Sequence, residues 1–174
     1  ECSLPVKTVQ SYFEILEDTL VAIKLKAWNR SVRKRLTTHP RYYLFDTGVT
    51  NAICRRLDST PDSVLKGRLF EQFIVLETYR ILSYRQSSVN MFYWRTGGGA
   101  EVDLVFEKNN KLMAGFEIKS SKHVTSANTT GLRSLKEEYP EIQLFIISEV
   151  NEPFMLGSIE VLPWRKYLKD TLLK

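Results

Sequence analysis

The chain has 174 residues, of which 43% are hydrophobic and 26% are charged, a composition that suits a soluble domain with at most a small appendage. No apolar run approaches the roughly 18 residues of a membrane-spanning helix, and no signal-peptide pattern is present, so we expect a cytoplasmic protein with no membrane partner. Cys2 and Cys54 lack the spacing of a zinc site and predict free thiols. Because the chain opens on Glu1 and not on methionine, we expect it to be part of a longer protein.

The N-terminal part, residues 1–36, predicts a helix followed by a strand. Ser3 suits the N-cap and Pro5 the first turn, and apolar residues then recur at helical spacing as far as Leu16. Residues 20–28 alternate in the manner of a strand. A helix followed by a basic strand is typical of the second half of a winged helix-turn-helix. The alternative is a helix–strand pair that only packs on a neighbouring domain.

Basic residues gather in this N-terminal part. The net charge of the whole chain is +5, and residues 1–40 carry 7 basic and 4 acidic side chains. Such an excess is compatible with DNA as a partner, and a solvated basic surface is the alternative. The candidate phosphate contacts are Lys7, Lys24, Lys26, Arg30, Arg33, Lys34 and Arg35.

The remaining residues, 37–174, predict an α/β domain. An apolar helix over residues 67–82, with Glu71 in its first turn, precedes three strands that short turns join as antiparallel neighbours. A further helix and a buried strand follow, so the core order is helix, three antiparallel strands, helix, strand. The predicted elements are a β-rich run at 41–46, a turn at 47–48, a helix at 51–57, strands at 91–95, 100–107 and 112–119, a helix at 129–139, strands at 143–148 and 158–162, and a last helix at 163–172.

Two of these strands carry the residues suited to catalysis. Alternation along residues 100–107 places Asp103 on the face opposite Val102 and Leu104. Along residues 112–119, Glu117 and Lys119 share one face. Pairing of the two strands in a hairpin therefore brings Asp103 beside Glu117, with Lys119 next to them.

This arrangement suits metal-dependent hydrolysis. Two carboxylates at short range repel each other unless a cation lies between them, and hard oxygen ligands suit Mg²⁺ or Mn²⁺. A bound Mg²⁺ polarises a scissile phosphate and activates a water molecule, while a neighbouring lysine orients or deprotonates that water. We therefore assign Asp103 and Glu117 as metal ligands and Lys119 as the residue that acts on the water. Glu71 is a third carboxylate, acting directly or through water.

The same residues carry a resemblance to a known superfamily. Gly99-Ala-Glu-Val-Asp103, followed by 13 residues and then Glu117-Ile-Lys119, resembles the PD-(D/E)XK signature of restriction-endonuclease-like proteins. Glu71 matches the additional acidic position of that superfamily, and Val102 stands where the signature has proline. The resemblance implies a restriction-endonuclease-like core that cleaves phosphodiester bonds.

A closer resemblance extends over nearly the whole chain. Five motifs in order resemble the uncharacterised C-terminal domain of prokaryotic AAA+-type ATP-binding proteins. The resemblance implies an upstream ATPase module, then a winged helix ending within residues 1–36, then a nuclease-like domain at residues 37–174. The chain itself has no GxxxxGK[ST] motif, so no nucleotide is expected in it. The motifs are Tyr42-Tyr-Leu-Phe-Asp-Thr-Gly48, Gly67-Arg-Leu-Phe-Glu71, Tyr93-Trp-Arg95, Gly99-Ala-Glu-Val-Asp103 and Phe116-Glu-Ile-Lys-Ser-Ser121.

Two functions remain open from the sequence. The first is a Mg²⁺-dependent DNA endonuclease domain driven by the upstream ATPase and positioned on DNA by the basic N-terminal part. The second is a catalytically inactive nuclease-fold scaffold that docks the ATPase onto DNA or protein. Glu101 also has two interpretations, because it could contact the metal or pair with Arg95 across the hairpin.

Overall fold

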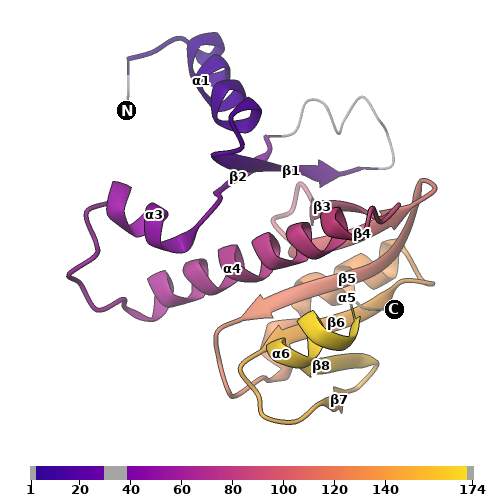
Figure 1. The fold of residues 1–174 in the computed structure, drawn as a ribbon. Coiled ribbons are helices and arrows are strands. Elements are labelled where there is room, and N and C mark those ends of the chain that lie inside the picture. The colour runs from indigo at the N-terminus through magenta and orange to yellow at the C-terminus, as the bar shows by residue number, and fades with distance from the viewer. Residues whose placement is uncertain (1–2, 30–38, 172–174) are drawn as a thin grey trace.

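The computed structural model describes residues 3–29 and 39–171, which form an α/β fold. Over these residues there are five α-helices and one mixed eight-stranded sheet (Figure 1). The helices are α1 (Val6–Asp18), α3 (Thr47–Ile53), α4 (Ser63–Tyr84), α5 (Thr130–Glu138) and α6 (Trp164–Lys166), with a 3₁₀ turn at Ser126–Thr129 and a π-helix at Tyr167–Thr171. The strands are β1 (Ala22–Trp28), β2 (Arg41–Leu44), β3 (Asn90–Arg95), β4 (Glu101–Lys108), β5 (Lys111–Lys119), β6 (Gln143–Ser148), β7 (Phe154–Leu156) and β8 (Ile159–Pro163).

The sheet joins the N-terminal part of the chain to the rest. The strand order is β2-β1-β3-β4-β5-β6-β8-β7, with β2 at one edge. Strands β3, β4 and β5 are antiparallel neighbours, as the short turns predicted. Strand β6 is parallel to β5 and is reached through α5, so the predicted order of helix, three antiparallel strands, helix, strand is confirmed. Strand β1 pairs with β2 on one side and, in parallel, with β3 on the other.

Helices cover both faces of the sheet. Ile74, Val75 and Leu76 of α4 pack in one hydrophobic cluster with Tyr167 of the C-terminal segment. Leu132 and Leu135 of α5 belong to the other cluster, on the opposite face. Figure 1 shows α4 and α6 in front of the central strands and α5 behind them. The carboxylate-bearing strands β4 and β5 therefore lie in the middle layer, where most side chains are buried.

Helix α4 begins earlier than its apolar residues predicted. The Asp62 side chain accepts a hydrogen bond from Leu65 N at 2.7 Å, so the helix starts at Ser63 and not near Gly67. Glu71 consequently lies in the third turn, and the prediction of a first-turn carboxylate is wrong. The earlier start moves Glu71 away from the helix N-terminus, so the helix dipole does not stabilise its charge.

Other local predictions also need correction. Helix α1 starts at Val6 with Pro5 as its N-cap, so Ser3 is not the cap. The predicted turn at residues 47–48 is the first turn of α3, because Asp46 caps that helix by accepting from Val49 N at 2.9 Å. The last predicted helix is a short α6 that continues as the π-helix, and strand β7 was not predicted. The domain boundary between residues 36 and 37 and the winged-helix interpretation stay predictions.

A candidate active site between β4, β5 and α4

A β-bulge in β4 determines where Asp103 lies. In the pairing of β3 with β4, two β4 residues, Asp103 and Leu104, lie opposite Tyr93. As a result Val102 and Val105 pack in the same hydrophobic cluster, while Leu104 packs in the other one. The strict alternation predicted from the sequence, with Val102 and Leu104 on one face, is therefore wrong at this point. Bulges of this kind often redirect a side chain beside a functional site.

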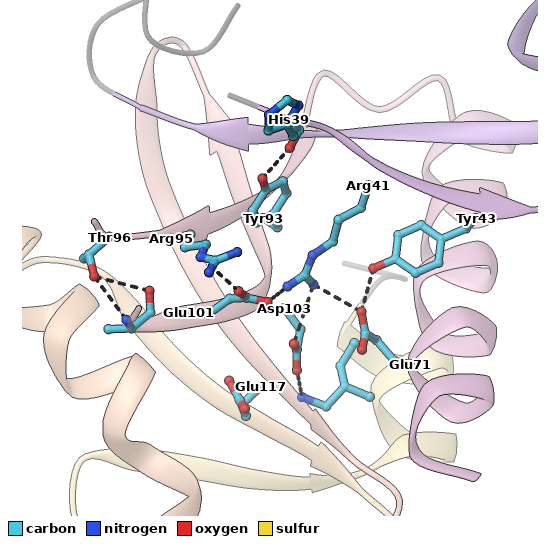
Figure 2. Close-up of polar contacts among 12 residues, drawn as sticks. His39, Arg41, Tyr43, Glu71, Tyr93, Arg95, Thr96, Glu101, Asp103 and Glu117 are labelled. Carbon is cyan, nitrogen blue, oxygen red and sulfur yellow. Dashed lines mark hydrogen bonds and ion pairs between the residues drawn. The ribbon is translucent and has the colours of Figure 1, made fainter. Parts of the chain in front are cut away.

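The Asp103 carboxylate lies where the hairpin opens. The regular pairing of the hairpin ends at Leu104 with Phe116, and beyond it Asp103 Oδ2 accepts a hydrogen bond from the backbone N–H of Ile118 at 2.9 Å. A side-chain oxygen thus replaces a backbone partner between β4 and β5. This contact holds the carboxylate over β5, next to the position of Glu117 (Figure 2).

Glu117 carries a buried carboxylate with one unsatisfied oxygen. Its side chain is 14% exposed, and Lys119 Nζ lies 2.6 Å from Oε1. The other oxygen, Oε2, is buried and has no hydrogen-bond partner. Burial, and then the negative charge of Asp103, raise the pKa of Glu117 to about 7. The predicted convergence of Asp103, Glu117 and Lys119 is thus present in the geometry.

Lys119 is held as a cation. Burial opposes its charge, but the attractions of Glu117, Asp103 and Glu71 outweigh this, and the pKa of Lys119 is raised. A lysine with a raised pKa remains an ammonium group at neutral pH. Its three N–H donors suit it to bind a water molecule or a developing negative charge and not to remove a proton.

Glu71 faces the same cluster from the third turn of α4. Its Oε1 accepts a hydrogen bond from the Tyr43 hydroxyl at 2.6 Å and lies 3.2 Å from Arg41 Nη1. Burial, and then the charge of Asp103, raise the pKa of Glu71. Residues of β2 therefore contact one oxygen of Glu71, the carboxylate that was predicted to support a metal directly or through water.

Arg41 is the site residue that the sequence analysis missed. Its Nη1 lies 3.7 Å from Asp103 Oδ1 as well as close to Glu71, and its Nη2 forms an ion pair with Glu101. Its guanidinium lies over the ring of Tyr93, 4.6 Å from the ring centroid. Figure 2 shows Arg41 between the carboxylates of β4 on one side and Glu71 on the other. The available signal was its position immediately before the motif that begins at Tyr42.

Glu101 pairs with two arginines. Arg95 Nε lies 3.6 Å from Glu101 Oε2, which agrees with the interpretation of a pair across the hairpin. The second partner is Arg41. The backbone of Glu101 also fixes the start of α5, because a Cβ at Gly131 would lie 1.9 Å from the Glu101 carbonyl oxygen. Only glycine permits this approach of the helix to β4.

The carboxylates of Asp103 and Glu117 fit a divalent cation in one respect, because one of their oxygens is buried and unsatisfied. Among residues 3–29 and 39–171, no three His, Cys, Asp or Glu side chains are grouped as a set that could hold a metal ion. Asp103 and Glu117 nevertheless form a pair with one buried, unsatisfied oxygen. Such a pair fits a hard divalent cation that takes its remaining ligands from water or from a phosphate. Asp103 and Glu117 would hold this ion.

The predicted DNA contacts lie on α1 and β1 where they can be described. Lys7 and Lys26 are exposed. Lys24 is half-buried, and its Nζ lies 3.2 Å from Glu17 Oε2. The remaining candidates, Arg30, Arg33, Lys34 and Arg35, lie outside the described residues.

Comparison with known proteins gives the family. The family described as "Domain of unknown function (DUF4143)" matches residues 66–167, more than half of the chain, and the chain belongs to this family. A second "Domain of unknown function (DUF8612)" matches residues 1–60. The two matches divide the site, because Arg41 and Tyr43 fall in the second and the carboxylates with Lys119 fall in the first.

Two curated relatives are similar to this chain along most of its length. They are uncharacterized protein Rv2008c of Mycobacterium tuberculosis and uncharacterized protein Mb2031c of Mycobacterium bovis, each 29% identical over 157 residues. The match covers 88% of this chain and 34% of each relative, so the chain spans about a third of their length. No solved structure matches the chain. Within the described part, no helix is both long enough and apolar enough to cross a bilayer.

Proposed function

We propose that the chain carries a Mg²⁺- or Mn²⁺-dependent site that cleaves phosphodiester bonds in DNA. Asp103 and Glu117 are the metal ligands, Lys119 binds the attacking water, and Glu71 supports the site. The observation that carries the proposal is the pair of Asp103 and Glu117 at the point where β4 and β5 separate, with a buried carboxylate oxygen that has no partner. A divalent cation would satisfy that oxygen and relieve the repulsion between the two carboxylates.

The order of elements supports a restriction-endonuclease-like core. Helix α4, strands β3 to β5, helix α5 and strand β6 follow each other as such a core requires, and the Asp and Glu-x-Lys residues fall on β4 and β5. A bound cation would polarise the phosphate and lower the pKa of a water molecule. The chain's own residues position that water. Lys119 donates to it as an ammonium group, and Glu117 orients Lys119 through the 2.6 Å contact.

The wider assembly is part of the proposal. The relatives are about three times as long as this chain, since the match covers 34% of each. This leaves room for the ATPase module that the sequence motifs imply. In this arrangement the ATPase moves or loads DNA, and residues 1–36 complete a winged helix that contacts phosphates through Lys7, Lys26 and the basic residues 30–35.

A second candidate function is a non-cleaving scaffold. The observation that favours it is Arg41, whose single positive charge already pairs with Asp103, Glu71 and Glu101. A site with an internal cation needs no metal to be stable. In such a scaffold the nuclease fold would only dock the ATPase onto DNA or onto another protein.

Plasmid nicking by the longer protein, with ATP and either Mg²⁺ or Mn²⁺, tests the choice. Lys119→Ala should lower nicking by about 10²- to 10³-fold, because one preorganised donor to developing charge is lost. Lys111→Ala is the matched control, since Lys111 is an exposed lysine at the start of the same strand. Nicking that survives in Lys119→Ala would contradict the assignment, and no nicking by the longer protein on supercoiled, linear or single-stranded DNA would favour the scaffold.

A further inference from the structure

Strand β2 supplies a cation to the acidic cluster. Arg41 and Tyr43 lie on β2, within residues 1–60, whereas Glu71, Glu101 and Asp103 lie within residues 66–167. The two parts are therefore matched by different families and meet at the carboxylates. Arg41 contacts all three carboxylates, and Tyr43 contacts one of them.

We propose that Arg41 is an internal counter-cation that competes with the divalent metal, so that β2 acts as a latch on the metal site. This inference rests on the proposed function and adds regulation to it. Docked β2 keeps the site closed to metal, and displacement of β2 opens it.

Competition follows from the contacts. Arg41 Nη1 lies 3.7 Å from Asp103 Oδ1, the oxygen that is more open to an ion because the other oxygen accepts from Ile118 N. A guanidinium and a divalent cation that share one carboxylate oxygen repel each other at short range, and the repulsion is strong where burial lowers the local dielectric. Arg41 and the metal therefore bind Asp103 in alternative states.

The place of β2 in the sheet permits release. Within the described residues it is an edge strand and pairs with β1 alone, over the four residues of the strand. Tyr43 packs in the core cluster with α4, and Leu44 O accepts a hydrogen bond from Gln72 Nε2 at 2.8 Å, so release of β2 must also break these contacts. Three further polar contacts lie near Arg41. They are the Arg41 ion pairs, the Tyr43 hydrogen bond to Glu71, and the hydrogen bond of 2.6 Å from the Tyr93 hydroxyl to the carbonyl of His39. An interaction that draws this segment away, with DNA or with the rest of the longer protein, would remove Arg41 from the carboxylates while β3, β4 and β5 stay paired.

The competition predicts that removal of Arg41 tightens metal binding. Calorimetric titration with Mn²⁺ on the 174-residue chain, wild type and Arg41→Gln, measures the effect, and heat that disappears in Asp103→Asn is assigned to this site. We expect Arg41→Gln to lower the dissociation constant by on the order of tenfold, a typical coupling between linked sites. Arg95→Gln is the matched control, because Arg95 contacts Glu101 but not Asp103. It should bind Mn²⁺ like the wild type.

A second variant covers the case in which Arg41→Gln does not fold. Arg41→Lys keeps a positive charge but has a single ammonium group, which cannot reach three carboxylates together. It should tighten Mn²⁺ binding by a smaller factor than Arg41→Gln. Melting temperature gives an independent measurement, since Mn²⁺ should raise it more in either variant than in the wild type.

The outcomes separate the latch from the metal site. Equal Mn²⁺ affinity in the wild type and both variants would overturn the latch while the metal site stands. Weaker binding in the variants would also overturn it, because Arg41 would then assist metal binding. Absence of Asp103-dependent heat from every protein would overturn the proposed metal site, and the latch with it.

Discussion

The strands that carry the carboxylates are buried far more deeply than helix α1 near the N-terminus. In β4, every residue is buried except Glu101, Asp103 and the terminal Lys108. In α1, no residue is buried, and apolar side chains such as Val6 and Tyr12 remain exposed. The difference indicates that strand pairing fixes the carboxylates, whereas α1 lies on the outside of the fold. Strand β2, which carries Arg41, lies between these extremes, with Tyr43 buried and its other residues half-buried.

The largest expected effect is a loss of stability when a side chain of the core beneath the site is truncated. Phe116 is 1% exposed and contacts the rings of Phe106, Phe145 and Tyr167. Phe116→Ala should lower the free energy of unfolding by about 3–5 kcal/mol, because a cavity remains and the transfer energy of the ring is lost. Val6→Ala on α1 should change it by less than about 0.5 kcal/mol. Urea unfolding measures both, and comparable losses would show that α1 is packed as firmly as β5.

The sequence predicted the local part of this picture. A hairpin of two strands joined by a short turn depends on neighbouring residues only, so the pairing that brings Asp103 near Glu117 and Lys119 could be anticipated. The contact of Arg41 could not be anticipated, because it depends on the parallel pairing of β1 with β3 across the intervening α4. The bulge at Asp103 likewise has no signal in the alternation, since it arises from the pairing of β4 with β3.

The start of α4 shows a different reason for error. The dense apolar pattern of the helix begins near Leu69, after the isolated pair Val64 and Leu65, and it guided the prediction. The first turn of α4 is mostly exposed, with Leu65 half-buried, and it is fixed by the Asp62 cap. A cap therefore outweighed the hydrophobic pattern in setting the helix end, and with it the position of Glu71 along the helix.

A smaller effect, on the pH dependence of stability, should distinguish the buried carboxylate of Glu117 from a carboxylate on the surface. The folded protein holds the proton of Glu117 more tightly than the unfolded chain, because its pKa is raised from 4.5 to about 7. Between these values the folded state binds more protons, so stability falls as the pH rises. Glu117→Gln stays neutral and should lose this fall, so its stability relative to the wild type should be greater at pH 8 than at pH 4.

Urea unfolding in the presence of a chelator, at both pH values, measures this difference. Glu138→Gln is the control, since Glu138 is an exposed carboxylate on α5. Its stability relative to the wild type should not depend on pH in this way. The same relative stability of Glu117→Gln at both pH values would show that Lys119 and the solvent already compensate the charge of Glu117.

The smallest effect concerns the N-terminal lysines and sharpens the comparison between the two parts of the chain. Each phosphate contact that a lysine makes releases condensed counterions, so the slope of log K for DNA binding against log salt changes by about 0.9 per contact. Lys26 is exposed, and Lys26→Ala should reduce the slope by about this amount if β1 lies along the DNA. Lys24 should contribute less, because its ammonium group already pairs with Glu17 at 3.2 Å.

Fluorescence anisotropy of a labelled duplex at several salt concentrations, with the longer protein, gives the slopes. Lys111→Ala, at the distant β4–β5 turn, should leave the slope unchanged. An equal change in Lys26→Ala and Lys111→Ala would indicate a general charge effect, and then the N-terminal part would have no special role in holding DNA.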